Sequence, residues 1–494
     1  MSDFMVVVLW TDALVLLLVA GLAVFAFYVR RKEHLRAPWW RVAQSRSGMA
    51  ALVVLTVFIG IGLLDSLHFR LAIAGAGKDG EPSYAVEVLS VFDALVAPLR
   101  ERKETSYSAP LAAYLFMKQT AELPDGRQSR EYPRLVYGGA HLGDPATDRV
   151  PDILMRTALG LASGAGVWLI LDVLIALILA RRRRSSFGTT HRDLWAGAIE
   201  VPWNTILSTI AVLLLIAGPI FMLSGYYHVL GTDKVGQDVL YLSLKSIRTG
   251  LVIGTLTTLV TLPLALLLGI MAGYFGGRTD DVIQYLYTTL NSIPGVLLIA
   301  AAVLMTQVYM DTHAERFETV NHRADFRLLC LCIILGVTSW TGLCRLLRGE
   351  TLKLREMEYI QAAQAFGVAQ FRILTRHILP NVMHIVLIAI VMDFSALVLA
   401  EAVLSYVGVG VDPSMISFGT MINSARLEMA REPMVWWSLA AAFTFLFLLV
   451  LAANLFADAV RDAFDPRVRI RTPAEATKER GAPRPGPALQ ESAR

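Results

Sequence analysis

The chain has 494 residues, of which 55% are hydrophobic and 17% charged, and its formal net charge is +4. A soluble protein of this length carries about 25% charged residues, so the composition argues against a soluble enzyme. The small positive charge gives no reason to expect a nucleic-acid partner, because much of it gathers at the ends of apolar segments.

The apolar residues are concentrated in nine blocks, each near the length of about 20 residues that a helix needs to cross a bilayer. We therefore predict an all-α polytopic membrane protein with about nine transmembrane helices. The predicted spans are 5–28, 49–67, 157–180, 205–227, 248–273, 283–307, 328–347, 383–406 and 435–457. Pro294 is expected to kink the sixth span, since proline removes a backbone hydrogen bond.

Basic residues near the span ends predict the orientation. The segment "RRKEHLRAPWWRVAQSRS" follows the first span, and the third span ends in the four arginines 181–184. Lys and Arg close to a span are retained in the cytoplasm, so both segments are expected on that side. Alternation from there places the N-terminus outside and the C-terminus in the cytoplasm.

The spacing of the spans divides the chain into three regions. Residues 1–204 hold three spans and a polar extracytoplasmic stretch at about 68–156, in which 90–104 resembles a short amphipathic helix. Residues 205–467 hold six spans joined by short loops. Residues 468–494 are rich in Pro, Ala and charge, which predicts a disordered cytoplasmic tail.

Three cysteines all lie in the seventh predicted span: Cys330, Cys332 and Cys344. A helix directs the two thiols of a C-x-C pair to different faces, so we expect packing residues and no metal site.

Between the seventh and eighth spans lies a polar, alanine-rich segment, 358–381. Read as a helix, its first half carries mostly small side chains on one face, which would let another protein approach closely. The residues of that face are Glu358, Ala362, Ala365 and Ala369. Gly367 predicts a left-handed turn that ends this helix, and Pro380 suits the first turn of the next span. A second short helix is expected between them, with an apolar side formed by Phe371, Leu374 and Ile378.

This segment resembles the EAA loop of the inner-membrane permeases of binding-protein-dependent ABC importers. That loop has two alanines, a glycine four positions later and a Leu-Pro near its end. The matching residues here are Ala362, Ala363, Gly367, Leu379 and Pro380. Two positions depart from the pattern: Gln361 stands where the family often has Glu, and His377 where it often has Ile. Glu358 could replace the missing acid.

In the family the loop docks into a groove on the ATPase subunit, so the resemblance implies the same coupling role for 358–381. The alternative is an ordinary amphipathic connector between two spans.

Four further segments resemble the dipeptide, oligopeptide and nickel branch of that family. They are "LGTDKVGQDVLY" (230–241), "AGYFGGRTDD" (272–281), "LAEAVLSYVGVGVDPSMISFGTMI" (399–422) and "NLFADAVRDAFDPR" (454–467). The resemblance covers about residues 205–467 and implies a six-helix permease core there. The segment "REYPRLVYGGAHLGDPATD" is also similar to a periplasmic segment after the first span of some peptide permeases. In that alternative the second span is the ancestral first one, and two spans have been added.

The resemblance implies the permease subunit of an ATP-driven importer that moves peptides or related small solutes from the periplasm to the cytoplasm. It also implies the bacterial inner membrane as location. The expected partners are ATP-binding cassette ATPase subunits, a second permease subunit in a heterodimer, a periplasmic solute-binding protein and the lipid bilayer. The stretch 68–156 is expected to contact the binding protein or the second permease, because it is longer than a connector needs to be.

The chain contains no G-x-x-x-x-G-K-[ST] phosphate loop, so ATP hydrolysis is assigned to the partners, and neither an enzyme nor a cofactor is expected. The sequence does not distinguish among peptides, modified peptides and nickel as the solute.

Three acidic residues fall within or near predicted spans: Asp172, Asp393 and Glu401. Such groups usually face the bundle interior or water, so they either line a path or form interhelical hydrogen bonds. A structural role is favoured for Asp172, and Asp393 and Glu401 are candidates for the translocation path. They also define the alternative function, a stand-alone secondary transporter or channel that uses both as ion-coupling groups. The paired broken helices and internal repeats of many secondary transporters are not apparent.

Overall fold

The computed structural model describes residues 4–73, 83–122, 128–317 and 319–464. Within these ranges nine helices are long and apolar enough to cross a membrane, which confirms the predicted fold class. They are α1 (Trp10–Arg30), α3 (Arg46–Asp65), α6 (Pro145–Arg183), α8 (Trp203–Ser224), α9 (Val239–Phe275), α11 (Gly295–Thr312), α12 (Val320–Arg355), α15 (Leu379–Val407), which continues a helical run from Gln370, and α17 (Trp437–Phe464). The predicted tail, 468–494, lies outside the described residues.

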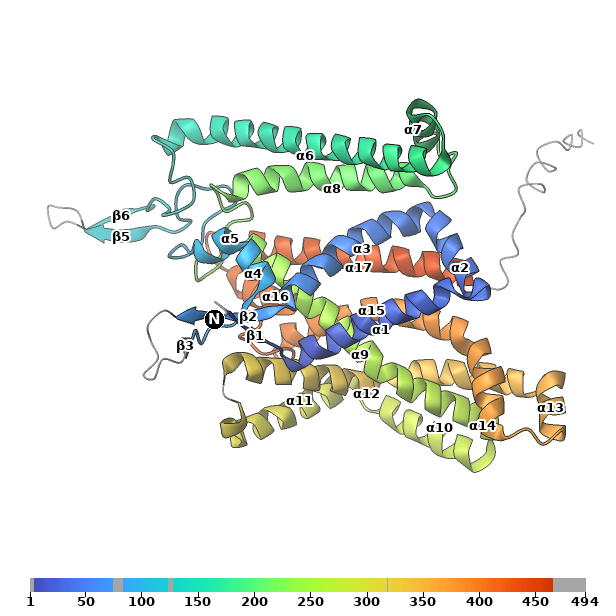
Figure 1. Ribbon diagram of the computed structural model, residues 1–494. Helices are drawn as coiled ribbons and strands as arrows, with labels where there is room; N and C mark the ends of the chain where they lie inside the picture. The colour runs from blue at the N-terminus through green and yellow to red at the C-terminus, as the bar shows by residue number, and fades with distance from the viewer. Residues whose placement is uncertain (1–3, 74–82, 123–127, 318, 465–494) are drawn as a thin grey trace, which may run out of the picture.

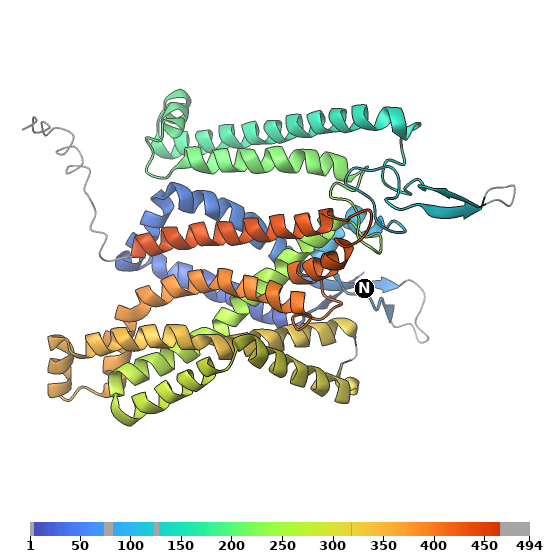
Figure 2. The ribbon, with the colours of Figure 1, turned by 180° about the vertical axis from the view of Figure 1, so that it is seen from behind.

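The long helices lie side by side, and the two ends of the bundle differ (Figures 1 and 2). One end, which we call the module end, carries the strands and two short helices. These are β1 (Phe4–Val7), β2 (His68–Ile73), β3 (Ser83–Tyr84), β4 (Leu89–Ser90), α4 (Val91–Leu95), α5 (Ala97–Glu101), β5 (Gln119–Glu122) and β6 (Gln128–Glu131). All strand pairs are antiparallel: β2 pairs with β1, β3 and β4, and β5 pairs with β6. The single amphipathic helix expected near 90–104 is thus two short helices.

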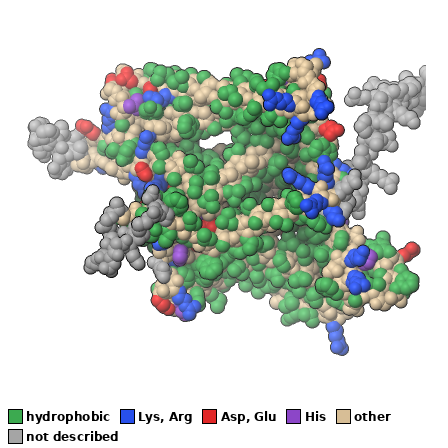
Figure 3. All heavy atoms as spheres, in the orientation of Figure 1, with side chains coloured by type: hydrophobic (Ala, Val, Ile, Leu, Met, Phe, Trp, Pro, Cys, Tyr) green, Lys and Arg blue, Asp and Glu red, His purple; other side chains and the backbone are tan. Residues whose placement is uncertain are grey.

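The opposite end, which we call the loop end, carries α2 (Glu33–Gln44), α7 (Phe187–Trp195) and α13 (Glu358–Ala365). The arginines 181–184 are exposed there. On the face that Figure 3 shows, hydrophobic side chains cover most of the length of the bundle, and groups of Lys and Arg gather at the loop end. The two basic segments and the segment 358–381 therefore share one end, as alternation of the spans requires.

Pro294 divides the sixth predicted span into two helices and does not merely kink it. The helix α10 (Gly277–Ser292) ends before it, and α11 begins at Gly295, so the proline separates two helices. Beyond α11 a short 3₁₀ turn (Ala314–Arg316) leads to α12. The prediction of one continuous span over 283–307 was wrong in this respect, because proline cannot donate the backbone hydrogen bond that would continue the helix.

Glycines bring α9 and α12 into close contact along their length. A Cβ at Gly269 would lie 2.8 Å from the carbonyl oxygen of Cys344, and one at Gly273 would lie 2.8 Å from that of Arg348. A Cβ at Gly336 would lie 2.6 Å from the Val260 side chain. Small residues at such a contact let two membrane helices pack backbone to backbone. The pair α9–α12 therefore forms the rigid centre of the bundle.

The helices α6 and α8 pair in the same way but to one side of this centre (Figure 1). A Cβ at Gly160 would lie 2.5 Å from Pro219 Cα, and one at Gly164 would lie 2.5 Å from the carbonyl oxygen of Leu214. Apart from α6 and the adjoining α7, α8 packs chiefly on α3, and α3 packs on α9 and α17. The α6–α8 hairpin is thus joined to the rest of the bundle chiefly through α3.

A buried polar joint connects the module end to the start of α9. Asp238 caps α9 by accepting from the backbone N–H of Leu240, and its other oxygen lies 2.8 Å from His228 Nδ1. On the other side of the His228 ring, Nε2 lies 3.4 Å from Glu104 Oε1. Glu104 also accepts from the backbone N–H groups of residues 136–138. The segment "LGTDKVGQDVLY" therefore anchors the residues after α5 and before α6 to the first turn of α9.

The charges of this joint stabilise one another. Burial alone would lower the pKa of His228, but its hydrogen bonds to Asp238 and Glu104 outweigh burial and raise that pKa to about 9. Burial would raise the pKa of Glu104, but the hydrogen bonds from His228 and from three backbone N–H groups lower it to about 2.

We expect the stability of the protein to fall at alkaline pH through His228. A group whose pKa is raised by folding stabilises fully below its ordinary value, here 6.5, and this contribution is lost as pH rises through about 9. Thermal unfolding of the detergent-solubilised protein, measured from pH 6 to pH 10, should show this decline. In His228→Gln the decline over the same interval should be smaller, and an unchanged profile in that variant would contradict the assignment.

Candidate functional site

The segment 358–381 folds as a helix, a turn and a second helical stretch at the loop end. Gly367 follows α13 with φ +70°, the left-handed conformation expected from the sequence, and among the described atoms nothing lies within 4 Å of the position of a Cβ there. The helix α14 (Gln370–Ile373) comes next and passes into a π-helical turn (Leu374–Ile378). Leu379 then begins α15, with Pro380 in its first turn.

Three isoleucines fix this segment to the bundle: Ile360, Ile373 and Ile378, each 0% exposed. They share one apolar cluster with residues of α9, α12 and α15, and Ala363 and Leu379 pack against it. The face of small residues is left exposed, as expected: Glu358, Ala362, Ala365 and Ala369 all lie at the surface.

Two aromatic side chains project from the segment on either side of Gly367. Phe366 is 87% exposed and Phe371 is 76% exposed. The prediction that Phe371 shares one apolar side of the second helix with Leu374 and Ile378 was wrong, because Ile373 takes the buried position and Phe371 faces outward. Phe366 was not identified from the sequence. The signal that could have identified it is an aromatic residue next to a turn glycine in a loop expected to face water. Exposed aromatics of this kind are typical of binding surfaces.

Polar contacts brace the segment against the end of α9. Arg355 Nη1 donates to the carbonyl oxygen of Tyr274 at 3.2 Å, and Gln364 Nε2 lies 3.4 Å from the Tyr274 hydroxyl. Just beyond, Arg348 forms a two-pronged ion pair with Asp280, with distances of 2.5 and 2.6 Å. The segment "AGYFGGRTDD" thus supplies contacts that hold the loop in place relative to α9 and α12.

The two positions that depart from the family pattern make local contacts. Gln361 Nε2 donates to the carbonyl oxygen of Glu356 at 3.3 Å, and the carbonyl oxygen of His377 accepts from Asn381 at 2.6 Å. The Glu358 carboxylate lies in the first turn of α13, where the helix dipole favours an acid.

A groove of about 930 Å³ opens between α9, α12 and α15. Its walls are mostly apolar, with a few polar side chains that include Thr261, Ser339 and Glu350. Asp393 of α15 lies on this lining, and in the part of the chain that the structure describes its carboxylate makes no hydrogen bond or ion pair. A carboxylate in this position can receive a cation or a hydrogen-bond donor from a solute.

Glu401 lies elsewhere on α15 and has a different environment. Its carboxylate is 1% exposed and accepts hydrogen bonds from Ser405 Oγ at 2.7 Å and Ser417 Oγ at 2.9 Å. Ser417 caps α16 (Phe418–Glu428). Glu401 therefore joins α15 to α16, and it does not line the groove. The two candidate path residues are not brought together.

Asp172 has the structural role favoured from the sequence. Its carboxylate accepts from Trp195 Nε1 at 3.2 Å and lies 2.9 Å from His191 Nε2, both on α7. These contacts fold α7 back against the end of α6.

The nine spans and the groove indicate a multi-pass membrane transport protein. Residues 265–470 match the family described as "Binding-protein-dependent transport system inner membrane component". The chain belongs to this family, as a permease subunit of an inner-membrane importer.

Three relatives illustrate the match. The chain is 31% identical to an oligopeptide transport system permease protein of Mycobacterium tuberculosis over 245 residues, which is 50% of this chain and 78% of that protein. It is 28% identical to a dipeptide transport system permease protein of Bacillus subtilis over 242 residues, with coverage of 49% and 69%. It is 32% identical to a glutathione transport system permease protein of Pectobacterium atrosepticum over 244 residues, with coverage of 49% and 73%.

The contrast between Asp393 and Glu401 gives a test by stability. In Glu401→Leu two serine hydroxyls lose a buried acceptor, at a cost of about 1–3 kcal/mol, and the apparent melting temperature should fall. In Asp393→Leu no hydrogen bond is lost, so the melting temperature should stay near that of the parent. Both would be measured by size-exclusion chromatography after heating in detergent. If Glu401→Leu is as stable as the parent, the structural role of Glu401 is excluded.

Proposed function

We propose that this chain is the permease subunit of an ATP-driven importer that moves peptides or related small solutes from the periplasm to the cytoplasm. The similarity to permease proteins of oligopeptide, dipeptide and glutathione transport systems supports this solute class. The observation that carries the proposal is the loop 358–381. Its exposed face of small residues and its two exposed aromatic side chains form a surface on which an ATPase subunit can dock. ATP binding and hydrolysis then belong to that partner, because the chain has no phosphate loop.

The helices on both sides of the loop connect it to the groove. α12 enters the loop and α15 leaves it, and both form walls of the groove. A displacement of the loop by closing ATPase subunits would therefore shift two groove walls together. Since the groove is only partly enclosed by this chain, we propose that a second permease subunit completes the path.

Asp393 is the residue that we place on this path. Its unpaired carboxylate could meet the amino terminus of a peptide as the solute passes. The stand-alone transporter, which needs both Asp393 and Glu401 as ion-coupling groups, is not favoured by the family assignment, and Glu401 is already bound to two serines.

The packing of α3 supports the alternative division of the chain. We propose that α3, together with α9, α10–α11, α12, α15 and α17, forms the six-helix core, and that the α6–α8 hairpin is an addition. The module end would then face the periplasm and receive the binding protein, with the N-terminus on the same side and the C-terminus in the cytoplasm.

Replacement of Gly367 should uncouple transport from ATP hydrolysis. In Gly367→Val a β-branched residue would have to take φ +70°, at a cost of about 1–3 kcal/mol, so the turn would change and α13 would leave its position. Ala362→Asp should act similarly by placing a charge on the contact face. We expect normal membrane insertion, weaker ATPase binding and loss of the hydrolysis that loaded binding protein stimulates.

Two control variants separate strain from side-chain size. Gly367→Asn should retain coupling, because asparagine tolerates the left-handed conformation. Gly349→Val places the same valine on α12 at a glycine with open space and no positive φ, and it should also couple normally. Normal coupling in both Gly367→Val and Ala362→Asp would leave the segment as an ordinary connector.

The orientation can be tested by cysteine labelling in intact cells, in a variant without the native cysteines. A cysteine at Thr120 on β5 should react with an impermeant maleimide from the periplasm, and one at Ser185 beside α7 should be protected until the cells are opened. The reverse pattern would invert the layout and place the loop 358–381 on the wrong side for an ATPase.

A further inference from the structure

The first turn of α1 forms a buried polar link between α9 and α12 at the module end. Asp12 Oδ1 accepts from Arg248 Nη2 of α9 at 2.5 Å, and Asp12 Oδ2 lies 2.7 Å from His68 Nδ1. The neighbouring Thr11 turns to α12: its backbone N–H donates to Asp325 Oδ2 at 3.2 Å, and its hydroxyl donates to Asp325 Oδ1. Thr11 and Asp12 are 0% and 1% exposed, so this link is shielded from water.

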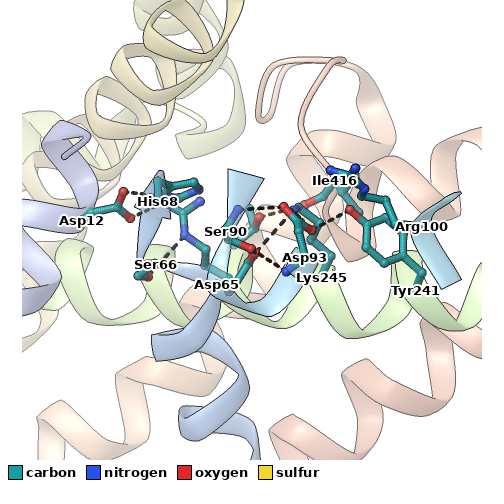
Figure 4. Close-up of polar contacts among 12 residues, drawn as sticks. Asp12, Asp65, Ser66, His68, Ser90, Asp93, Arg100, Tyr241, Lys245 and Ile416 are labelled. Atoms are coloured by element: carbon teal, nitrogen blue, oxygen red, sulfur yellow. Dashed lines mark hydrogen bonds and ion pairs between the residues drawn. The ribbon is translucent and has the colours of Figure 1, made fainter. Parts of the chain in front are cut away.

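A second cation of α9, one turn before Arg248, is paired with acids from other parts of the N-terminal region. Lys245 Nζ lies 2.5 Å from Asp93 Oδ1 of α4 and 3.3 Å from Asp65 Oδ1 at the end of α3. The hydroxyl of Tyr241 also donates to Asp93, at 2.8 Å. Figure 4 shows these contacts lying in one row beside α9. The acids that face Lys245 therefore come from residues 1–204.

Apolar contacts continue the link along α1. Leu14 and Val15 pack against a cluster to which α9 and α12 contribute most residues, among them Ile253, Leu328 and Leu331. α1 thus lies against both helices of the close-packed pair, and its charged turn closes the contact at the module end. Separating α1 from α9 would remove from Arg248 the only carboxylate that forms an ion pair with it among the described residues, and separating α1 from α12 would remove both hydrogen bonds of the buried Asp325. Either loss is unfavourable, because a buried charge would lose its close partner.

We propose that α1 is a fixed part of the permease and that α1, α9 and α12 move as one unit during transport, with Asp12 as the positioning residue that keeps Arg248 neutralised. The helix α1 is then required by the core and is not a detachable extension. The proposal concerns motion within the proposed importer, and its transport test rests on that function, whereas its stability test does not.

Cross-linking α1 to α12 tests whether the contact opens during the cycle. Thr11→Cys/Asp325→Cys would be made in a background with Cys330, Cys332 and Cys344 replaced by Ala, assembled with its partners in proteoliposomes and treated with a short bifunctional thiol reagent. We expect the cross-linked transporter to keep at least half of the ATP hydrolysis that solute-loaded binding protein stimulates in the untreated sample. The single variant Thr11→Cys, treated identically, controls for modification of one thiol.

The outcomes separate the two proposals. Loss of stimulated hydrolysis on cross-linking alone would show that α1 and α12 part during the cycle, which overturns the fixed unit. If assembled parental protein gives no stimulated hydrolysis with any loaded binding protein encoded beside it, the importer function itself fails.

The role of Asp12 is tested by a pair of variants that does not depend on transport. Asp12→Asn leaves Arg248 buried without its carboxylate and should lower the apparent melting temperature in detergent by at least about 5 °C. The double variant Asp12→Asn/Arg248→Met removes both charges and should regain at least half of that loss, since the buried guanidinium no longer lacks its carboxylate. Asp12→Glu should remain close to the parent. An unchanged melting temperature in Asp12→Asn, or no recovery in the double variant, would exclude the link.

Discussion

The close packing of α9 against α12 is the constraint on which the rest of the structure depends. Three glycines, Gly269, Gly273 and Gly336, let the two backbones approach so closely that any side chain there would collide with its neighbour. This contact fixes the end of α12 beside the end of α9, where Tyr274 can hold Arg355 and Gln364. It also fixes the other ends of both helices, where α1 joins them. A groove wall and the loop are therefore attached to the same rigid pair.

Polar contacts in this protein are concentrated where elements far apart in sequence must meet. Glu401 joins α15 to α16, Asp172 joins α6 to α7, and Glu104 with Asp238 joins the module to α9 through His228. Each of these carboxylates is matched by specific donors, so the contacts fix orientation as well as position. Asp393, which lies on the groove, lacks such a match within the described residues, and this difference separates it from the structural acids.

Much of the fold could be predicted from the sequence because its determinants are local. The length of the apolar blocks predicted the nine spans, and the glycine at 367 predicted the left-handed turn of the loop.

The side of the helix on which Phe371 lies could not be predicted from helical periodicity. α14 has only four residues, and the π-helical turn that follows is wider than an α-helical turn, so it rotates later residues relative to earlier ones. The partners of Arg248 were equally inaccessible, since Asp12 lies 236 positions away. The only local sign was two cations, Lys245 and Arg248, one turn apart at the start of an apolar span.

The hairpin of α6 and α8 has a consequence for how such a chain can acquire new spans. Its two helices pair with each other through Gly160 and Gly164, so the hairpin buries its closest contact without borrowing a surface from α9 or α12. The hairpin crosses the membrane twice. An insertion with an even number of membrane crossings returns the chain to the side of the membrane from which it left. Every helix after the hairpin keeps its direction, and the loop 358–381 stays on the side that we propose for its ATPase partner. A single added helix at the same place would have inverted all that follows.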